Sequence, residues 1–491
     1  MRRLPLRPIA ALCLVAGFRA PLSGQIAVPD QLESWYAEAL TRAPGTWGVV
    51  VADDQGKVLW SVNGDQAMTP ASTVKVLTTG FARSRVGGEA RRPTRVHGVG
   101  AVDPVDGTWK GSWSLELNGD PTLERPDVGG PTLRQLADQL RAIGIQKLNG
   151  PLRLSSLEGS TRTAYPAAWG SRHRGRYFAP PVGPMTLNEN LVAFTLSPGS
   201  KVGAAPELTA NLPSGVDAMV QVQARTVAGR TNRLVIRASG GGWVVTGTIG
   251  RSAPARRYTF VAHDPTALVT AVWQDALDRV GIAWDRSAAP GRTSGDLRVL
   301  AEVASPTFDA IAAEVNRRSV NIGAELLLAW GSDSGSAARQ LEEHVRQVTG
   351  LSEGIRLHDG SGLSDNDRVS PVVFTTYLAN FPRTAAGRDF PFLLPANGSG
   401  TLRSLATGLP ERGVVRAKTG SLNNTATLVG YLGRPDGLLL VAAMYNGPRT
   451  SNARQAQWDL FRALGADGVV IPPMGDTDVE VTFGGEAVRG R

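Results

Sequence analysis

The chain of 491 residues has one cysteine, Cys13, and no apolar run long enough to cross a bilayer. Cys13 lies in the apolar run 9–18, which follows three arginines and precedes small residues at 23 and 24. This layout is typical of a secretory signal peptide, so we predict that residues 1–24 are removed on export. The mature chain would then lack cysteine, which excludes disulfides, thiolate catalysis and cysteine metal sites. We expect a periplasmic or otherwise extracytoplasmic protein without a transmembrane anchor.

A concentrated basic region is also missing. The formal net charge is +9, and removal of residues 1–24, which hold four arginines and no acidic residue, leaves +5. The other arginines are scattered and form no basic block interleaved with aromatic residues. We therefore expect no nucleic-acid partner, and at most a peripheral association with an anionic cell envelope.

Lysine is scarce, because only six of the 52 basic residues are lysines. Two of the six are Lys75, in the stretch STVK, and Lys418, in the stretch RAKTG. A lysine can lose its proton when it is desolvated, whereas an arginine in practice cannot. The two lysines are therefore candidates for proton transfer, although any one of the six could also have persisted by chance.

Both ends of the chain contain the pattern of a β-hairpin flanked by a helix. Apolar runs around turn residues predict hairpins over 47–61 and 426–447, and a further strand over 414–420. Helical periodicity follows over 70–84 and over 452–464. We expect one sheet built from both chain ends and flanked by helices.

We expect the middle of the chain to be an insertion between the two parts of this sheet. Residues 131–145 and 265–282 each predict a helix ending near glycine, and the region between them is rich in short Val/Thr/Gly strands. We predict an α/β fold, an antiparallel sheet flanked by helices, with two nested inserted domains. The expected units are a catalytic domain (25–95 and 296–475), an inserted α/β domain (96–185 and 261–295), a nested β-rich domain (186–260) and a tail (476–491).

The first chemical motif is Ser72-x-x-Lys75. Pro70 favours a helix start, so Ser72 would lie in the first turn with Lys75 on the same face one turn later. A serine hydroxyl becomes a good nucleophile when a neighbouring base takes its proton, and a desolvated lysine can be that base. Taken alone, the pair also occurs as an ordinary surface spacing.

The second motif is Lys418-Thr419-Gly420 on the predicted strand. Gly420 would let a substrate backbone approach, the strand edge could pair with an extended peptide, and Lys418 would attract an anionic group. The alternative is a plain strand that ends in a turn.

The third motif has two candidates. Ser319 and Asn321 precede a strong helical pattern, whereas Ser364, Asp365 and Asn366 lie in a turn-rich loop. We prefer Ser319 and Asn321, because a helix fixes side-chain geometry better than a loop tip does.

In this order the motifs resemble the penicillin-binding protein and serine β-lactamase superfamily. The flanking sequences are more specific and resemble the D-alanyl-D-alanine carboxypeptidase/endopeptidase family, peptidase family S13, which comprises low-molecular-mass class C penicillin-binding proteins. The similarity runs from about residue 28 to 470. The matching stretches are PASTVKVLTTG, NGDPTL, NRRSVNIGAELLL, DGSGLS, GTLR and VRAKTGSL.

The resemblance implies roles for five catalytic residues. Ser72 would be the acylated nucleophile and Lys75 the base that activates it. Ser319 and Asn321 would relay the leaving-group proton and hold the peptide, and Lys418 would assist the Ser319 relay.

The same resemblance implies a substrate-binding strand. Lys418 and Thr419 would receive the terminal carboxylate of the substrate beside Gly420. The backbone N–H groups of Ser72 and Ser421 would form the oxyanion hole.

Two positions depart from the family pattern. The family often has an acidic residue after the helix predicted at 131–145, where this chain has Ser155 and Ser156 with Glu158 nearby. An arginine often follows DGSGLS, where this chain has Asp365. The diamino acid of the stem peptide that the protein accepts therefore stays open.

We expect a serine-type D-Ala-D-Ala carboxypeptidase or DD-endopeptidase acting on peptidoglycan stem peptides, with β-lactams as inhibitors and no metal or cofactor. The alternatives are a secreted serine β-lactamase, for which we find no Glu-x-x-Leu-Asn deacylation motif, and an inactive wall-binding scaffold. A Ser-His-Asp esterase and a metallohydrolase are not favoured, because the sequence has neither a Gly-x-Ser-x-Gly elbow nor a His-Glu-x-x-His motif. The balance between carboxypeptidase and endopeptidase, the oligomeric state and the role of the inserted domains stay open.

Overall fold

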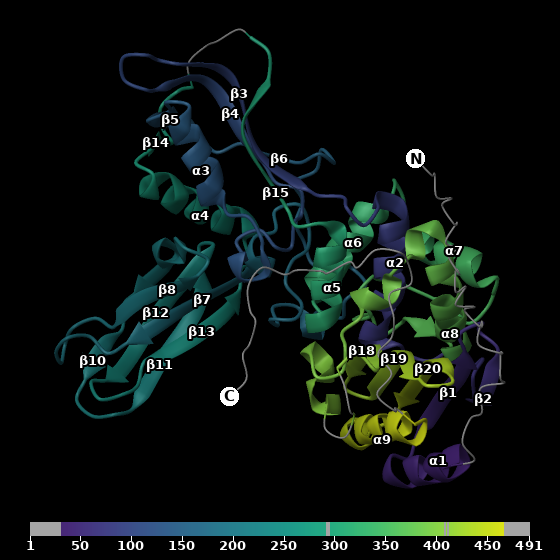
Figure 1. The fold of residues 1–491 in the computed structure, drawn as a ribbon. Helices are drawn as coiled ribbons and strands as arrows, with labels where there is room; N and C mark the ends of the chain where they lie inside the picture. The colour runs from purple at the N-terminus through teal and green to yellow at the C-terminus, as the bar shows by residue number, and fades with distance from the viewer. Residues whose placement is uncertain (1–30, 291–294, 407–408, 410–411, 466–491) are drawn as a thin grey trace, which may run out of the picture.

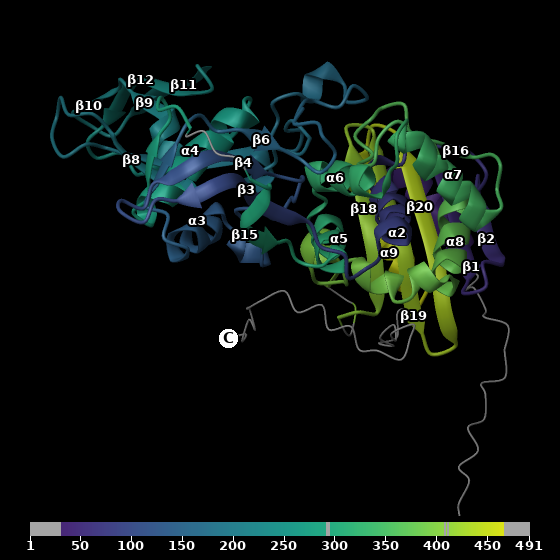
Figure 2. The ribbon, with the colours of Figure 1, turned by 90° about the horizontal axis from the view of Figure 1, so that it is seen from above.

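The structure is a computed structural model that describes residues 31–290, 295–406, 409 and 412–465. The predicted signal peptide and the predicted tail lie outside the described residues. The described chain forms two lobes, with both ends of the described sequence in one lobe and the middle in the other (Figures 1 and 2).

The first lobe, which we call the catalytic lobe, is built on an antiparallel five-stranded sheet in the order β18-β19-β20-β1-β2. The prediction that both chain ends build one sheet is confirmed. The strands are β1 (Thr46–Asp53), β2 (Val58–Val62), β18 (Val415–Leu422), β19 (Thr425–Arg434) and β20 (Gly437–Asn446).

Both faces of this sheet are covered, because successive side chains of a strand point to opposite faces. Along β1, Val49 and Val51 join the core beneath the sheet, whereas Val50 and Ala52 join the core on the other face. The helices α1 (Gln31–Arg42) and α9 (Thr450–Ala463) pack on the first core (Figure 1). The second core includes α2 (Val74–Val86), α5 (Phe308–Arg318), α6 (Asn321–Gly331), α7 (Ala337–Thr349) and α8 (Pro371–Asn380).

The second lobe, which we call the inserted lobe, has a four-stranded sheet in the order β15-β3-β4-β6. Its strands are β3 (Pro93–Val102), β4 (Trp109–Glu116), β6 (Leu154–Ser155) and β15 (Arg298–Ala304). The predicted helices are present as α3 (Leu133–Ala142) and α4 (Pro265–Arg279), next to the short parallel pair β5 (Lys147–Asn149) and β14 (Ala283–Asp285).

The predicted β-rich region forms two small sheets. Its strands are β7 (Leu191–Ser197), β8 (Glu207–Leu212), β9 (Val220–Val222), β10 (Arg225–Val227), β11 (Asn232–Ser239), β12 (Gly242–Gly250) and β13 (Arg256–Val261). Phe194 and Trp243 from these strands share one hydrophobic core with Leu136 of α3 and Trp273 of α4. The β-rich region and the α/β region of the inserted lobe therefore pack as one body.

The predicted domain boundaries cut through the four-stranded sheet. β3 begins before residue 96, and β15 lies after residue 295 but pairs with β3 along its length. We therefore propose that the inserted lobe extends from Pro93 to Ala304.

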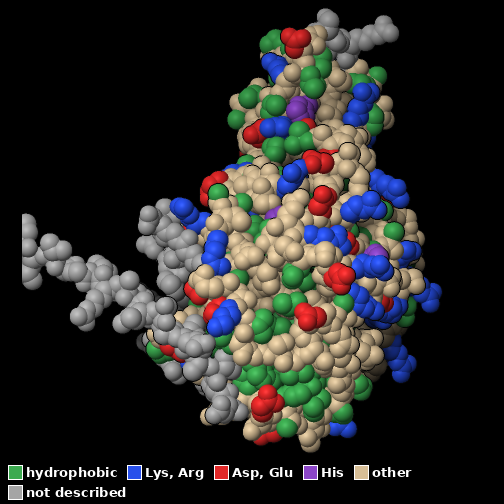
Figure 3. Space-filling view, turned by 90° about the vertical axis from the view of Figure 1, so that its right-hand side faces the viewer, with side chains coloured by type: hydrophobic (Ala, Val, Ile, Leu, Met, Phe, Trp, Pro, Cys, Tyr) green, Lys and Arg blue, Asp and Glu red, His purple; other side chains and the backbone are tan. Residues whose placement is uncertain are grey.

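The outer surface carries charge of both signs. On the face drawn in Figure 3, arginines and lysines are interspersed with acidic side chains. Within the described ranges, no helix combines the length and the apolar composition needed to span a bilayer.

Candidate active site

Ser72 lies in a short 3₁₀ turn, Ala71–Thr73, rather than in the helix itself, and α2 begins directly after that turn. Ala71 has a φ of 49°, a left-handed conformation that is strained for an alanine. The hydroxyls of Thr73 and Thr427 both donate to the carbonyl of Pro70, each at 2.7 Å. Because Thr427 belongs to β19, these hydrogen bonds fix the turn against the sheet.

Lys75 lies on α2, fully buried, and its amine contacts three oxygens. The Nζ atom is 2.9 Å from Ser72 Oγ, 2.7 Å from Asn321 Oδ1 and 2.6 Å from the carbonyl oxygen of Ser361. Burial lowers the pKa of Lys75 from 10.5 to about 7, although the negative charges of Asp359 and Glu325 oppose the shift. A substantial fraction of the amine is therefore neutral near pH 7 and can accept the Ser72 proton.

A second lysine–serine pair lies beside the first. Lys418 on β18 is fully buried, and its Nζ donates to Ser319 Oγ at 2.9 Å and to the carbonyl of Thr419 at 2.7 Å. Burial, together with the positive charges of Lys75 and Arg454, lowers the pKa of Lys418 well below 10.5. Two desolvated amines therefore each contact one hydroxyl in the same site.

The turn between α5 and α6 presents Ser319 and Asn321. Ser319 ends α5 with a φ of 62°, and Asn321 is the first residue of α6. The Asn321 amide accepts from Lys75 and donates to the carbonyl of Phe178 at 2.9 Å. The structure thus brings together the five residues predicted to be catalytic, from three separate stretches of sequence.

The predicted substrate-binding residues lie on β18, at one end of the sheet order. Thr419 is nearly buried, and Ser421 is exposed. A Cβ atom on Gly420 would lie 2.2 Å from Thr427 Oγ1, 2.7 Å from the Pro70 carbonyl oxygen and 2.9 Å from the backbone nitrogen of Ser72. Glycine is thus needed here for the strand to pass close to the turn that holds Ser72, a reason that the sequence did not indicate.

The alternative motif begins at the end of the turn whose Ser361 carbonyl contacts Lys75. The backbone N–H of Ser364, whose side chain is buried, donates to Asp359, and Asp365 forms an exposed ion pair with Arg172. Ser155, the other position that departs from the family pattern, pairs with Glu116 in the inserted sheet.

Sequence reasoning missed the acids behind Lys75. The Asp359 carboxylate accepts the backbone N–H groups of Gly362, Leu363 and Ser364 at 2.7, 3.0 and 2.8 Å, which folds the DGSGLS turn. That turn presents the Ser361 carbonyl to Lys75. The sequence does contain a signal for Asp359, because a carboxylate at the start of a Gly-rich turn commonly accepts such hydrogen bonds.

Glu325 lies on α6, one turn after Asn321, and its carboxylate accepts the backbone N–H of Gly360 at 3.0 Å. Burial and the charge of Asp359 raise its pKa. Arg454 of α9 donates to the carbonyl of Gly420 and to Ser421 Oγ, and adds a half-buried positive charge next to β18. The spacing from Asn321 points to Glu325, but no sequence pattern points to Arg454.

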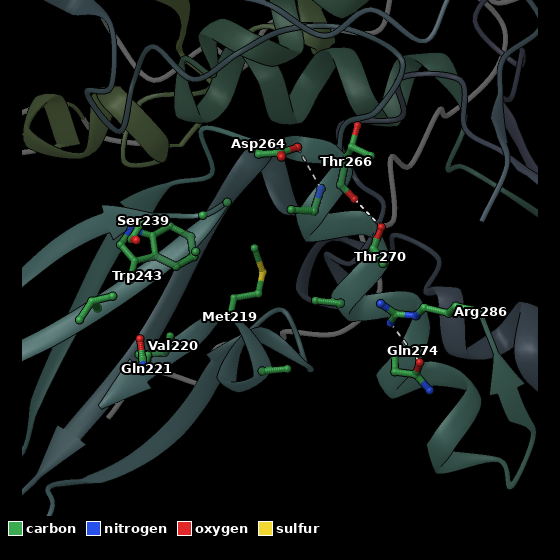
Figure 4. Close-up of a pocket in the computed structure, with 17 residues that line it drawn as sticks. Met219, Val220, Gln221, Ser239, Trp243, Asp264, Thr266, Thr270, Gln274 and Arg286 are labelled. Atoms are coloured by element: carbon green, nitrogen blue, oxygen red, sulfur yellow. Dashed lines mark hydrogen bonds between the residues drawn. The ribbon is translucent and has the colours of Figure 1, made fainter. Parts of the chain in front are cut away.

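A separate groove of about 850 Å³ lies in the inserted lobe, between β12 and α4 (Figure 4). Met219 projects into it, with Trp243 on one side and Arg286 on the other. Its charged side chains already have partners, since Arg286 donates to Gln274 at 3.0 Å and Asp264 caps α4. The predicted site residues do not line this groove.

Comparisons with known proteins agree with the residue pattern. A sequence model of the D-Ala-D-Ala carboxypeptidase 3 (S13) family matches residues 32–464. A D-alanyl-D-alanine carboxypeptidase of Actinomadura sp. (strain R39) is 26% identical over 82% of this chain and 77% of its own length. Carboxypeptidase DacB of Mycolicibacterium smegmatis is 27% identical over 85% of this chain and 80% of its own. Penicillin-binding protein 4 of Haemophilus influenzae has the same fold, with a TM-score of 0.67 at 20% identity over 87% of this chain and 99% of that one.

Proposed function

The chain belongs to the D-Ala-D-Ala carboxypeptidase 3 (S13) family, and from this membership we propose that it is a penicillin-binding serine DD-peptidase that acts on peptidoglycan stem peptides. The observation that carries the proposal is the buried Lys75 amine, 2.9 Å from Ser72 Oγ and with a pKa lowered to about 7. It is a base matched to neutral pH and in contact with a hydroxyl nucleophile.

In the acylation step, neutral Lys75 takes the proton of Ser72 as Ser72 Oγ bonds to the carbonyl carbon of the penultimate D-alanine. The backbone N–H groups of Ser72 and Ser421 stabilise the oxyanion, a contribution of about 3 kcal/mol per donor in related chemistry. When the C–N bond breaks, the proton held on Lys75 returns to the leaving amine through Ser319 and Lys418. Asn321 holds the peptide backbone.

In the deacylation step, a water molecule attacks the ester carbonyl and gives its proton to Lys75, which passes that proton to Ser72 Oγ as the ester bond breaks. Thr419, with the positive charges of Lys418 and Arg454 behind it, receives the terminal carboxylate of the substrate. Because Arg454 stays charged when Lys418 is neutral, it supplies the permanent part of that attraction. β-Lactams acylate Ser72 in the same way.

We further propose that the protein works outside the cytoplasm, where peptidoglycan lies, with at most a peripheral contact with the envelope. Export is tested by fractionating cells that produce the full chain and determining the N-terminus of the mature protein. A mature N-terminus near residue 25 in the extracytoplasmic fraction supports the proposal, and an intact chain in the cytoplasm contradicts it.

The function is tested by measuring intact mass after incubation with benzylpenicillin. The mature protein should gain one penicillin, and Ser72→Ala should gain none. The matched variant Ser84→Ala should gain one, because Ser84 lies on α2, the helix that follows the Ser72 turn, and its hydroxyl donates to the Phe81 carbonyl. Release of D-alanine from a synthetic stem pentapeptide should follow the same pattern. Rapid drug hydrolysis without an adduct would indicate a β-lactamase, and no reaction at all would indicate an inactive scaffold.

A further inference from the structure

One segment of the inserted lobe reaches into the active site. Residues 165–182 lie between β6 and β7, yet they contact the catalytic lobe at several points. The Trp169 indole, 2% exposed, donates to Asp359 Oδ2 at 3.1 Å. The Phe178 carbonyl accepts from Asn321 Nδ2 at 2.9 Å. Trp169 also packs in a small apolar cluster with Leu363, a residue of the DGSGLS turn.

The Phe178 carbonyl decides which way the Asn321 amide points. An asparagine amide presents an acceptor on one side and a donor on the other, and rotation by 180° exchanges them. With the donor side held by the Phe178 carbonyl, the oxygen must face Lys75 Nζ, where it lies 2.7 Å away. In the opposite orientation, the NH₂ group would face a protonated amine, which is repulsive.

The Trp169 indole acts on the other side of Lys75. Asp359 organises the turn that carries the Ser361 carbonyl, an acceptor 2.6 Å from Lys75 Nζ. The indole N–H is the donor that the inserted lobe contributes to Asp359, alongside three backbone N–H groups of the turn itself. A hydrogen bond to a charged, buried acceptor is among the stronger ones in proteins.

We propose that the segment 165–182 is a working part of the active site, in which Trp169 and the Phe178 carbonyl are positioning groups that hold the acceptors around the Lys75 amine. The proposal rests on the proposed acylation at Ser72. Under this proposal, the inserted lobe contributes to the chemical step.

The electrostatic consequence has a defined sign. Lys75 faces Asp359 from the turn, Glu325 from α6 and Lys418 from β18, with Asp367 behind Asp359 and Arg454 behind Lys418. Loss of the indole N–H leaves the Asp359 charge less compensated, which favours the Lys75 ammonium. The pKa of Lys75 should then rise, and the acid limb of the acylation rate should move to higher pH.

The test is Trp169→Phe, which removes the N–H and keeps an aromatic ring, in the full mature protein. The matched control is Trp113→Phe, because Trp113 is also buried and its indole donates at 2.9 Å to the Asn149 carbonyl within the inserted lobe. Benzylpenicillin acylation is followed by stopped flow from pH 5.5 to 9, which separates the binding constant from the acylation rate constant. For Trp169→Phe we expect the acylation rate constant at pH 7 to fall about tenfold with a shifted acid limb and little change in binding. The control should change neither.

Two further variants identify the route of the effect. If Trp169 acts through Asp359, Trp169→Phe should have little added effect in an Asp359→Asn background, a non-additivity expected of groups in contact. Trp169→His keeps a ring N–H and should recover part of the rate, and it replaces the Phe variant if that one does not fold.

The outcomes separate this inference from the proposed function. Wild-type protein that forms no Ser72 adduct overturns both. A wild-type adduct with an unchanged acylation rate constant in Trp169→Phe, or an equal fall in Trp113→Phe, overturns only the role of the segment. Lower thermal stability without a change in the pH profile would also overturn it.

Discussion

The pH dependence of acylation follows from the environment of Lys75. Burial lowers its pKa from 10.5 to about 7. At about 1.4 kcal/mol per pKa unit, this shift destabilises the ammonium form relative to the neutral amine by about 5 kcal/mol. The base must be neutral to take the Ser72 proton. The neutral fraction is about 0.09 at pH 6, about 0.5 at pH 7 and about 0.9 at pH 8 for a pKa of about 7.

The acylation rate constant for benzylpenicillin should therefore rise about tenfold from pH 6 to pH 8 and then level off. An exposed lysine with the ordinary pKa of 10.5 would give a different curve, rising about tenfold per pH unit through pH 9. Stopped-flow acylation at constant ionic strength distinguishes the two shapes. Lys75→Arg, which keeps the charge but cannot give up its proton, should be inactive at every pH. A rate that still rises tenfold per unit above pH 8, or an active Lys75→Arg variant, would refute the assignment of Lys75 as the base.

Three further predictions test the surroundings of the site and the stability of the catalytic lobe. Gly420→Ala forces a Cβ to within 2.9 Å of the Ser72 nitrogen. The rate constant of acylation by benzylpenicillin should therefore fall at least about 100-fold. A rate constant near that of the wild type would show that the strand moves freely. Arg454→Gln removes a positive charge that lowers the pKa of Lys418 and helps to attract the substrate carboxylate, so KM for a stem pentapeptide should rise more than kcat falls. Burial lowers the pKa of His344 to about 4, so the side chain is neutral in the folded protein and takes up a proton on unfolding below pH 6.5. The free energy of unfolding from urea titrations should therefore fall by about 2 kcal/mol between pH 7 and pH 5. This part of the loss should be absent in His344→Gln.

Much of the fold was predictable, because its elements have local signals. The hairpins at both chain ends, the helices after them and the two helices of the inserted lobe occur where apolar periodicity and turn residues predicted them. The order of strands within the sheet was not fixed by such signals. The placement of β15 in the inserted sheet depends on pairing with β3, about 200 residues or more earlier in the chain, and no local pattern reports that pairing.

The residues that we propose to react carry sequence signals, whereas the groups that contact them do not. The spacing of three residues between Ser72 and Lys75 indicates that pair, and the neighbouring residues in RAKTG indicate Lys418. Trp169, Phe178 and Arg454 contribute an indole N–H, a main-chain carbonyl and a guanidinium from remote segments. A main-chain carbonyl has no sequence signature, since every residue carries one, and its role appears only once the chain is folded.

The two lysines at this site, in a chain that otherwise uses arginine, have a physical explanation. Lys75 and Lys418 are both fully buried, and the charge of Lys75 helps to lower the pKa of Lys418, so the site disfavours holding two protons on its amines at once. That condition suits a reaction in which one proton leaves Ser72, resides on Lys75 and departs with the leaving group through Ser319 and Lys418. Arginine at either position would hold its proton permanently and break the relay. Where only a fixed charge is needed, behind β18, the chain uses Arg454.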